Sequence, residues 1–295
     1  YFDPQLNDRV YQQPQFFPTS GHENLGFYIV AAGSDKPFSV LATNVTPDLA
    51  MWGSSGGQFF PRWSYARLED EDGLFSTIAK NVDGYERVDN ITDAALNDYR
   101  AVYGASVSKD DIFYYVYALL HSEEYRKRYA ADLKKVLPRI PKVATADDFR
   151  AFVAAGRELA TLHVGYEQVE PYPLTEKVTG TGEDWELYRV QKMRFKGTGK
   201  NQDRSTIIYN SHVTLSGIPE DAYRYRIGSR SAIEWIMERY QVKVDKASGI
   251  VNDPNDWARE VGNPRYIVDL VKRIVTVSME TMKIVDSLPP LRLKT

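Results

Sequence analysis

The residues best suited to chemistry in this sequence are basic and lie in one run, "YRVQKMRFKGTGKNQDR", residues 188–204. Cationic side chains outnumber Asp203 six to one there, a local charge of +5, although the whole chain has a formal charge of −3. Lys and Arg on a strand pair with a Gly-rich tip suit a phosphate backbone, because each neutralised phosphate releases counterions. A solvated hairpin would have the same composition. The cationic residues are Arg189, Lys192, Arg194, Lys196, Lys200 and Arg204.

A second polar cluster follows in "YNSHVTLSGIPEDAYRYRIGSR". Asn210 and His212 come at the expected end of a strand, and Arg226 and Arg230 lie around a turn into a helix. Such positions allow contacts to phosphates or to base edges. Asn210 could equally cap its own turn.

A third candidate is the segment "RYQVKVDKASGIVNDPNDW", residues 239–257. Turn residues at Ser248-Gly249 and Asp253-Pro254 predict a shaped loop, because the residue before proline avoids the helical conformation. We expect this loop to dock one helix against the next, with Lys243 and Lys246 available for phosphate. The candidate DNA-binding residues are Lys192, Arg194, Lys196, Lys200, Arg204, Asn210, His212, Arg226, Arg230, Lys243 and Lys246.

Catalytic signatures are not found in the sequence. "FKGTGK" resembles the glycine turn of AdoMet-dependent methyltransferases, but it leads into an expected strand, whereas that turn should open a helix that receives the cofactor. The acidic pairs Asp147-Asp148 and Asp253 with Asp256 could serve a hydrolase if burial split their pKa values. Helix-start and turn positions explain them more simply.

Metal and thiol chemistry are also disfavoured. The chain has no Cys, which excludes thiolate nucleophiles and zinc sites that need thiolate. His22, His121, His163 and His212 are too widely spaced to predict a metal pair, so we expect structural histidines. We therefore expect no catalytic, cofactor-binding or metal residues in this chain.

Elements able to position these residues follow from periodicity. Residues 24–45 predict a β-hairpin turned at 33–37, and "WGSSGGQFFPRW" predicts a tight loop between strands. Capping boxes predict one helix over 112–135 after Ser108 and a second over 146–163 after Thr145, which should pack together.

Strands are expected again in "WELYRVQKMRF", "STIIYN" and "YRYRI". Ser231 and Glu234 predict a third helix, and an apolar stripe that begins at Ile267 predicts a last one from about Pro264. This segregation favours an α+β fold over a doubly wound sheet, with antiparallel β-rich and helical segments in one compact unit or two lobes. We expect a β-rich part over 1–107, a helical pair over 108–163, and strands plus C-terminal helices over 164–295.

Several long motifs resemble the C-terminal specificity region of Type ISP restriction-modification enzymes. They include "ALLHSEEYRKRYAADLKKVLPRIP", "LHVGYEQVEPYPL", "IIYNSHVTLSGIPEDAYRYRIGSRSAIEWIMERYQVKVDKASGIVNDPNDW" and "PRYIVDLVKRIVTVSMETMKIVDSLPPL". "YFDPQLNDRVYQQPQFFP" is similar to that family's junction with the methyltransferase, and the first Met is Met51, so we expect a piece of a longer protein.

The resemblance implies a target recognition domain that binds double-stranded DNA beside an adenine-specific methyltransferase of the same parent chain. AdoMet, ATP and Mg would then belong to the parent, with no cofactor in this piece and no chemistry of its own. A structural coupling domain that holds the methyltransferase and motor in register is the alternative, and a free-standing enzyme is a weaker one. The longest apolar run, 112–120, is too short for a bilayer, so we expect no membrane partner and a cytoplasmic location.

Overall fold

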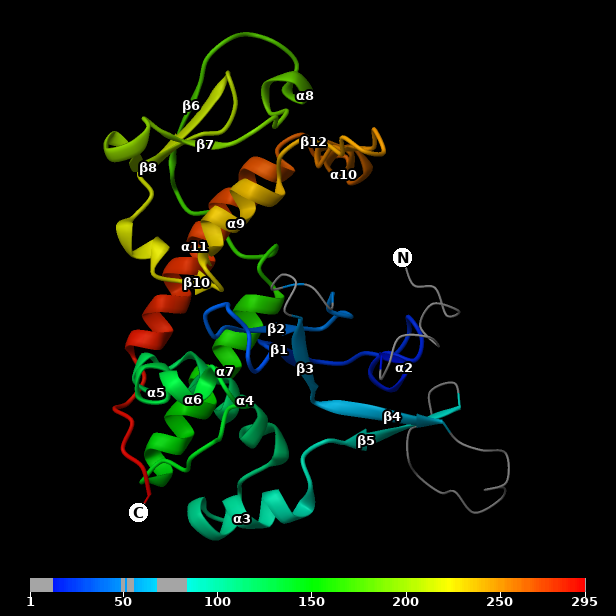
Figure 1. The fold of residues 1–295 in the computed structure, drawn as a ribbon, viewed down its shortest axis with the longest axis vertical. Helices are drawn as coiled ribbons and strands as arrows, with labels where there is room; N and C mark the ends of the chain where they lie inside the picture. Colours follow the sequence, from blue (N-terminus) through cyan, green and yellow to red (C-terminus); the bar gives the residue numbers. More distant parts are fainter. Residues whose placement is uncertain (1–12, 49–50, 52–55, 68–83, 295) are drawn as a thin grey trace. The chain divides into compact units, whose positions relative to one another are not determined.

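The structure is a computed structural model that describes residues 13–48, 51, 56–67 and 84–294. The chain forms two compact units, which we call unit 1 (Tyr1–Val164 with Ser287–Thr295) and unit 2 (Gly165–Asp286). The paired strands of the described residues are antiparallel, and along the chain β-rich segments alternate with groups of helices (Figure 1). The α+β prediction is therefore confirmed.

Within the described residues, the N-terminal part of unit 1 is a short helix followed by two small sheets. The predicted hairpin over 24–45 is confirmed, with Gly26 opposite Thr43 and Ile29 opposite Val40. The predicted Gly- and Ser-rich loop lies largely outside the described residues, since 52–55 are not described. The elements are α2 (Gln13–Phe16), the sheet β2-β1-β3 of β1 (Gly26–Val30), β2 (Val40–Thr43) and β3 (Gly57–Pro61), and the hairpin β4 (Trp63–Arg67) with β5 (Tyr85–Asp89).

The helices of unit 1 correct one prediction. The capping box at Ser108 is present, but the helix expected over 112–135 is three helices. Ser122 has φ −59° and ψ 124°, which ends the first helix, and its hydroxyl accepts from the Tyr125 amide to begin the next. The helices are α3 (Asp93–Tyr103), which the sequence analysis did not predict, α4 (Lys109–His121), α5 (Glu123–Arg128), α6 (Ala130–Leu133) and α7 (Ala146–Val164).

Helices α4 and α7 pack against each other as predicted. Gly156 lies at their closest approach, because a Cβ there would lie 1.9 Å from the Tyr114 carbonyl oxygen. Nearby, the ring of Tyr103 stacks on Phe149 with centroids 4.3 Å apart. Aromatic side chains thus fill the core where a glycine lets two helix backbones meet.

Two histidines of this core come together although they are 42 positions apart, His121 and His163, with ring centroids separated by 5.3 Å. The Tyr117 hydroxyl hydrogen-bonds to His163 Nδ1 at 2.6 Å. Burial, with Arg126 nearby, lowers the pKa of His163 from 6.5 to about 3. The same burial holds the pKa of His121 well below its usual value, so both rings are neutral in the folded chain.

Because these histidines are buried and neutral, we expect the free energy of unfolding of unit 1 to fall in acid. As pH falls through 6.5 towards about 3, the unfolded chain takes up a proton at His163 that the folded chain does not. The free energy of unfolding should therefore fall by about 1.4 kcal/mol per pH unit from this residue. Chemical denaturation at a series of pH values should show a shallower slope for His163→Gln, which keeps a polar group beside Tyr117 without a titrating one. If His163→Gln leaves the slope of unfolding free energy against pH unchanged, the lowered pKa of His163 is wrong.

The sheet of unit 2 has the strand order β6-β9-β8-β7. Of the predicted strands, "STIIYN" is confirmed as β8, but "WELYRVQKMRF" is wrong in its first half, because Leu187 and Tyr188 donate to Glu183 and Asp184 carbonyls in a helical turn. "YRYRI" is a turn that reaches only a two-residue strand. The elements are β6 (Thr175–Val178), α8 (Asp184–Leu187), β7 (Arg194–Lys196), η1 (Gly199–Asn201), β8 (Asp203–Ile208), β9 (Val213–Ser216), η2 (Glu220–Tyr223), β10 (Arg226–Ile227) and β11 (Arg230–Ser231).

The C-terminal helices of unit 2 confirm their predictions. The Ser231 capping box with Glu234 is present, and the apolar stripe that begins at Ile267 is buried. Helices α9 and α11 pack side by side (Figure 1). Among the described helices, none combines the length and the apolar character that a bilayer span needs. The elements are α9 (Ala232–Arg239), β12 (Lys243–Val244), β13 (Val251–Asn252), α10 (Asn255–Glu260) and α11 (Tyr266–Asp286).

An ionic cluster around Glu176 ties the sheet of unit 2 to α11. Its carboxylate accepts from Arg265 at 2.9 and 2.8 Å, from Lys272, and from the Tyr188 hydroxyl at 2.8 Å. These hydrogen bonds, led by that from Arg265, lower the pKa of Glu176 from 4.5 to about 2. Because Tyr188 begins the basic run, the cluster fixes the start of that run ahead of β7.

Candidate nucleic-acid interface

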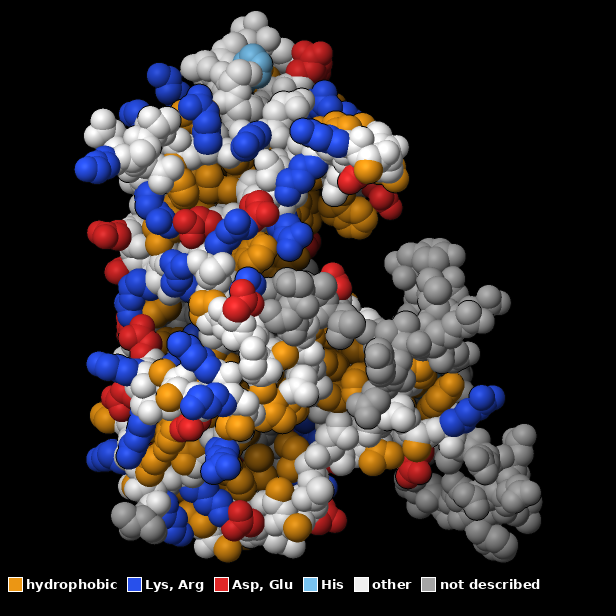
Figure 2. Space-filling view, in the orientation of Figure 1, with side chains coloured by type: hydrophobic (Ala, Val, Ile, Leu, Met, Phe, Trp, Pro, Cys, Tyr) orange, Lys and Arg blue, Asp and Glu red, His pale blue; other side chains and the backbone are white. Residues whose placement is uncertain are grey.

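The basic run folds into the edge of the unit 2 sheet. Strand β7 pairs with β8, and Phe195 points into the core opposite Ile207. Since side chains alternate along a strand, Arg194 and Lys196 lie on the exposed face. The sheet thus presents their charges to solvent, as Figure 2 shows for the Lys and Arg side chains that gather over this unit.

The loop from β7 to β8 is shaped by Gly197. This residue has φ 76°, and a Cβ would lie 2.2 Å from the Asn201 carbonyl oxygen, so only glycine fits. The tight turn places η1, with the exposed Lys200, at the tip of the hairpin. As expected from sequence, the glycines lead into a strand and form no helix-opening cofactor turn.

Beside this hairpin lies a groove of about 460 Å³, which we call the basic groove. Three of its cations come from one short segment: Arg189, Lys192 and Arg194. Within the described part of the chain, Lys192 and Arg194 form no ion pair, whereas Arg189 binds Asp253 at 2.9 Å. The groove is lined by Glu186, Arg189, Gln191, Lys192, Arg194, Ile208, Asn210, Ser211 and His212.

Asn210 shapes one wall of the basic groove. Its amide nitrogen donates to the Leu187 and Arg189 carbonyls at 2.8 and 2.9 Å, and its oxygen accepts from the backbone amides of His212 and Val213. Both donor hydrogens and the oxygen are therefore used inside the protein. This geometry corresponds to the turn-capping alternative, so Asn210 acts on the groove by positioning its neighbours.

His212 faces the same groove from the start of β9. Its Nδ1 lies 3.0 Å from the Thr179 carbonyl oxygen. A carbonyl only accepts, so Nδ1 carries the proton, and Nε2 is the ring nitrogen left to meet a ligand. This backbone contact fixes the orientation of the ring.

Four of the predicted DNA-binding residues line the basic groove together: Lys192, Arg194, Asn210 and His212. Lys196 and Lys200 continue the positive surface along the adjoining hairpin loop.

Three predicted arginines are held by other contacts. Arg204 binds Glu234 at 3.0 Å and covers the Tyr223 ring, 4.2 Å from its centroid. Arg230 binds Glu238, and Arg226 donates to the Ser229 carbonyl. They lie outside the groove lining.

The remaining candidates, Lys243 and Lys246, lie on the hairpin of β12 and β13, with Lys243 4.0 Å from Glu238. This hairpin is joined to the groove wall. Val242 donates to the Gln191 carbonyl at 2.9 Å, and the Asn255 side chain makes two hydrogen bonds to the Val190 backbone, each 2.9 Å. The loop over 239–257 therefore docks on the basic run, in addition to joining two helices.

Residues 1–270 match the model of the Type ISP C-terminal specificity domain. The chain belongs to this family. The resemblance seen in the sequence motifs is thereby confirmed. No curated protein matches the chain.

Three similar solved structures are Type ISP or related DNA complexes. The ATP-dependent Type ISP restriction-modification enzyme LlaBIII bound to DNA is 36% identical to this chain. The match covers 97% of this chain and 17% of the LlaBIII chain, with a TM-score of 0.81. A nuclease-deletion mutant of the Type ISP restriction-modification enzyme LlaGI, in complex with a DNA substrate mimic, is also 36% identical. The match covers 100% of this chain and 24% of the LlaGI chain, with a TM-score of 0.77. The protein in the DrdV–DNA complex is 34% identical to this chain. The match covers 100% of this chain and 27% of the DrdV chain, with a TM-score of 0.79. This specificity domain thus spans about a quarter or less of those chains.

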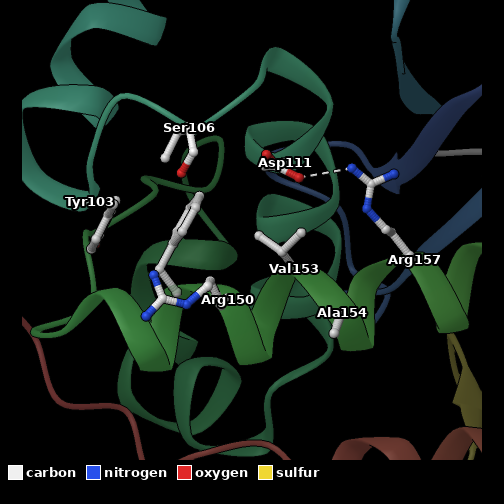
Figure 3. A pocket seen from close by; sticks show the side chains of 9 residues that line it. Tyr103, Ser106, Asp111, Arg150, Val153, Ala154 and Arg157 are labelled. Atoms are coloured by element: carbon white, nitrogen blue, oxygen red, sulfur yellow. Dashed lines mark hydrogen bonds and ion pairs between the residues drawn. The ribbon is translucent and has the colours of Figure 1, made fainter.

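The specificity domain has a second, smaller pocket of about 310 Å³ in unit 1 (Figure 3). Its two arginines are both paired, Arg157 with Asp111 at 2.8 Å and Arg150 with Asp147. The predicted DNA-binding residues do not line it. Lys192 and Arg194, which form no ion pair among the residues that the structure describes, make the basic groove the better site for an anionic ligand.

The groove lining also includes residues outside the predicted DNA-binding set. Arg189 and Gln191 are two of them, and both lie within "YRVQKMRF". Their proximity to Lys192 was the available signal. In the described residues, no group of three or more Asp, Glu or His is placed to hold a metal ion.

Proposed function

We propose that this specificity domain recognises double-stranded DNA through the basic groove. The observation that carries the proposal is the concave site in which Lys192 and Arg194 form no ion pair with any described residue and lie beside Gln191 and His212. Lys192 and Arg194 would bind phosphates and fix the register, and Gln191 and His212 would meet base edges. The DNA in the similar complexes supports the choice of ligand.

Within a longer parent, the domain would position the DNA for other domains that methylate an adenine and cut. Methylation of a base inside a duplex requires that the base be flipped out, and a domain that grips the flanking duplex helps to hold it there. AdoMet, ATP and Mg would serve those other domains, together with a methyltransferase partner on the same chain. The activity would take place in the cytoplasm.

A coupling domain that reads no bases is the second candidate. It is favoured by the surface arginines that are paired with carboxylates, such as Arg224 with Asp286 at 2.6 Å and Arg204 with Glu234. Pairs of this kind add little to DNA affinity, because a phosphate would have to displace the carboxylate. The unpaired cations of the basic groove do not follow this pattern, so we favour recognition.

Selection from random-sequence duplexes tests the proposal. The chain is titrated against the duplex pool at several salt concentrations, and the bound fraction is sequenced. We expect one asymmetric site to be enriched. The plot of log affinity against log salt should have a slope of about −4 or steeper, because Lys192, Arg194, Lys196 and Lys200 would each neutralise about one phosphate.

Binding without enrichment of any sequence would mean that the domain holds DNA nonspecifically and does not recognise a site. An absence of binding even at low salt would overturn it and favour the coupling domain.

A further inference from the structure

The hairpin of β12 and β13 displays apolar side chains to solvent. Val244 and Val251 are cross-strand partners, and their exposed fractions are 58% and 57%. Ile250, next to the turn, is 67% exposed. Three β-branched side chains that remain open to water on one two-stranded ribbon are unfavourable for an isolated domain, and such a patch typically marks an interaction surface.

Hydrogen bonds within the tip of this hairpin shape its turn. The Asp245 carboxylate accepts from the amides of Ala247 and Ser248 at 3.0 and 2.7 Å, and from the Ser248 hydroxyl at 2.9 Å. Gly249 closes the turn with φ 72°. A partner would therefore meet a turn whose backbone is already shaped, which lowers the entropy cost of binding.

The base of the hairpin is fixed to the basic groove. The Val242 and Asn255 hydrogen bonds reach the Gln191 and Val190 backbone, and Gln191 lines the groove. Lys243 and Lys246, both exposed, flank the apolar side chains. A ligand that lies in the groove would continue onto a surface with apolar side chains between cations.

We infer that the β12–β13 ribbon enters a groove of the bound duplex and places Ile250, Val244 and Val251 against sugars and base edges. Lys243 and Lys246 contact the phosphates on either side. Two-stranded ribbons fit a DNA groove, and apolar side chains pack there against sugars, thymine methyl groups or unstacked base steps. The positive charges that flank the patch favour DNA over a neutral or basic protein surface, and the hydrogen bonds that join the hairpin to the basic groove favour DNA over an acidic protein. The inference rests on the proposed DNA recognition.

Salt dependence separates the apolar contact from the charged one. In the chain with Val244→Ser, Ile250→Ser and Val251→Ser, we expect affinity for the selected duplex to fall at least about 10-fold, because apolar burial is lost. The slope of log affinity against log salt should stay unchanged, since no counterion release is lost. Lys243→Ala with Lys246→Ala should instead make the slope shallower by about 2.

Matched controls are Val45→Ser, Val136→Ser and Val178→Ser, three valines exposed elsewhere, which should leave affinity unchanged. Circular dichroism and melting should show each variant folded, because all of these side chains are exposed. If the hairpin variant binds the selected duplex with wild-type affinity, the inference is overturned while DNA recognition stands. If wild type selects no duplex at all, the proposed function fails first.

Discussion

Replacing Lys192 and Arg194 together by glutamate should lower DNA affinity about 100-fold at physiological salt. Both side chains line the basic groove without an ion pair among the described residues. Each therefore contributes its full charge to a phosphate or base, and the reversal adds repulsion to the loss. Fluorescence anisotropy with the selected duplex measures the affinity, and the salt slope should become shallower by about 2.

The matched control is Lys127→Glu with Lys283→Glu, which changes net charge equally at two exposed helical lysines. It should weaken binding only slightly, through the general field of the protein. Equal losses from both pairs would mean that DNA responds to overall charge, and the basic groove would not be the site. Both pairs should unfold at the wild-type temperature, because all four side chains are exposed.

Gly156→Ala should destabilise unit 1 by about 3 kcal/mol or more, the upper range for overpacking of a core. The added Cβ would lie 1.9 Å from the Tyr114 carbonyl oxygen and 2.6 Å from its carbon. Both are backbone atoms, so relief requires that α4 and α7 move apart and open the aromatic core. Urea denaturation followed by tryptophan fluorescence and circular dichroism measures the free energy of unfolding.

The direction of the change in stability distinguishes a glycine in a close helix contact from an exposed one. In a solvent-exposed helix, Gly→Ala stabilises by about 1 kcal/mol. Ala151→Gly, the reverse exchange on the exposed face of the same helix, should lower the free energy of unfolding by about 1 kcal/mol. It measures the effect of helix propensity alone. If Gly156→Ala stabilises the chain, close contact of the two helix backbones is wrong.

Local signals in the sequence were sufficient for several elements. The Ser108 and Ser231 capping boxes, the stripe of α11 and the hairpin over 24–45 depend on residues only a few positions apart, so their pattern survives in the fold. Local signals failed where one residue could serve two roles. Ser122 interrupts a helical pattern by capping a new helix, and Leu187 lies in a helical turn within an apparent strand.

The sequence by itself determined the α+β class, the positive charge of 188–204 and, through its long motifs, the Type ISP specificity domain family. Only the tertiary structure decided which cations remain available. Arg204 and Arg230 meet carboxylates from α9, Asn210 is used by its own turn, and the loop over 239–257 docks on Val190 and Gln191. Charge is a property of the residue, whereas its availability depends on partners that long-range packing brings near.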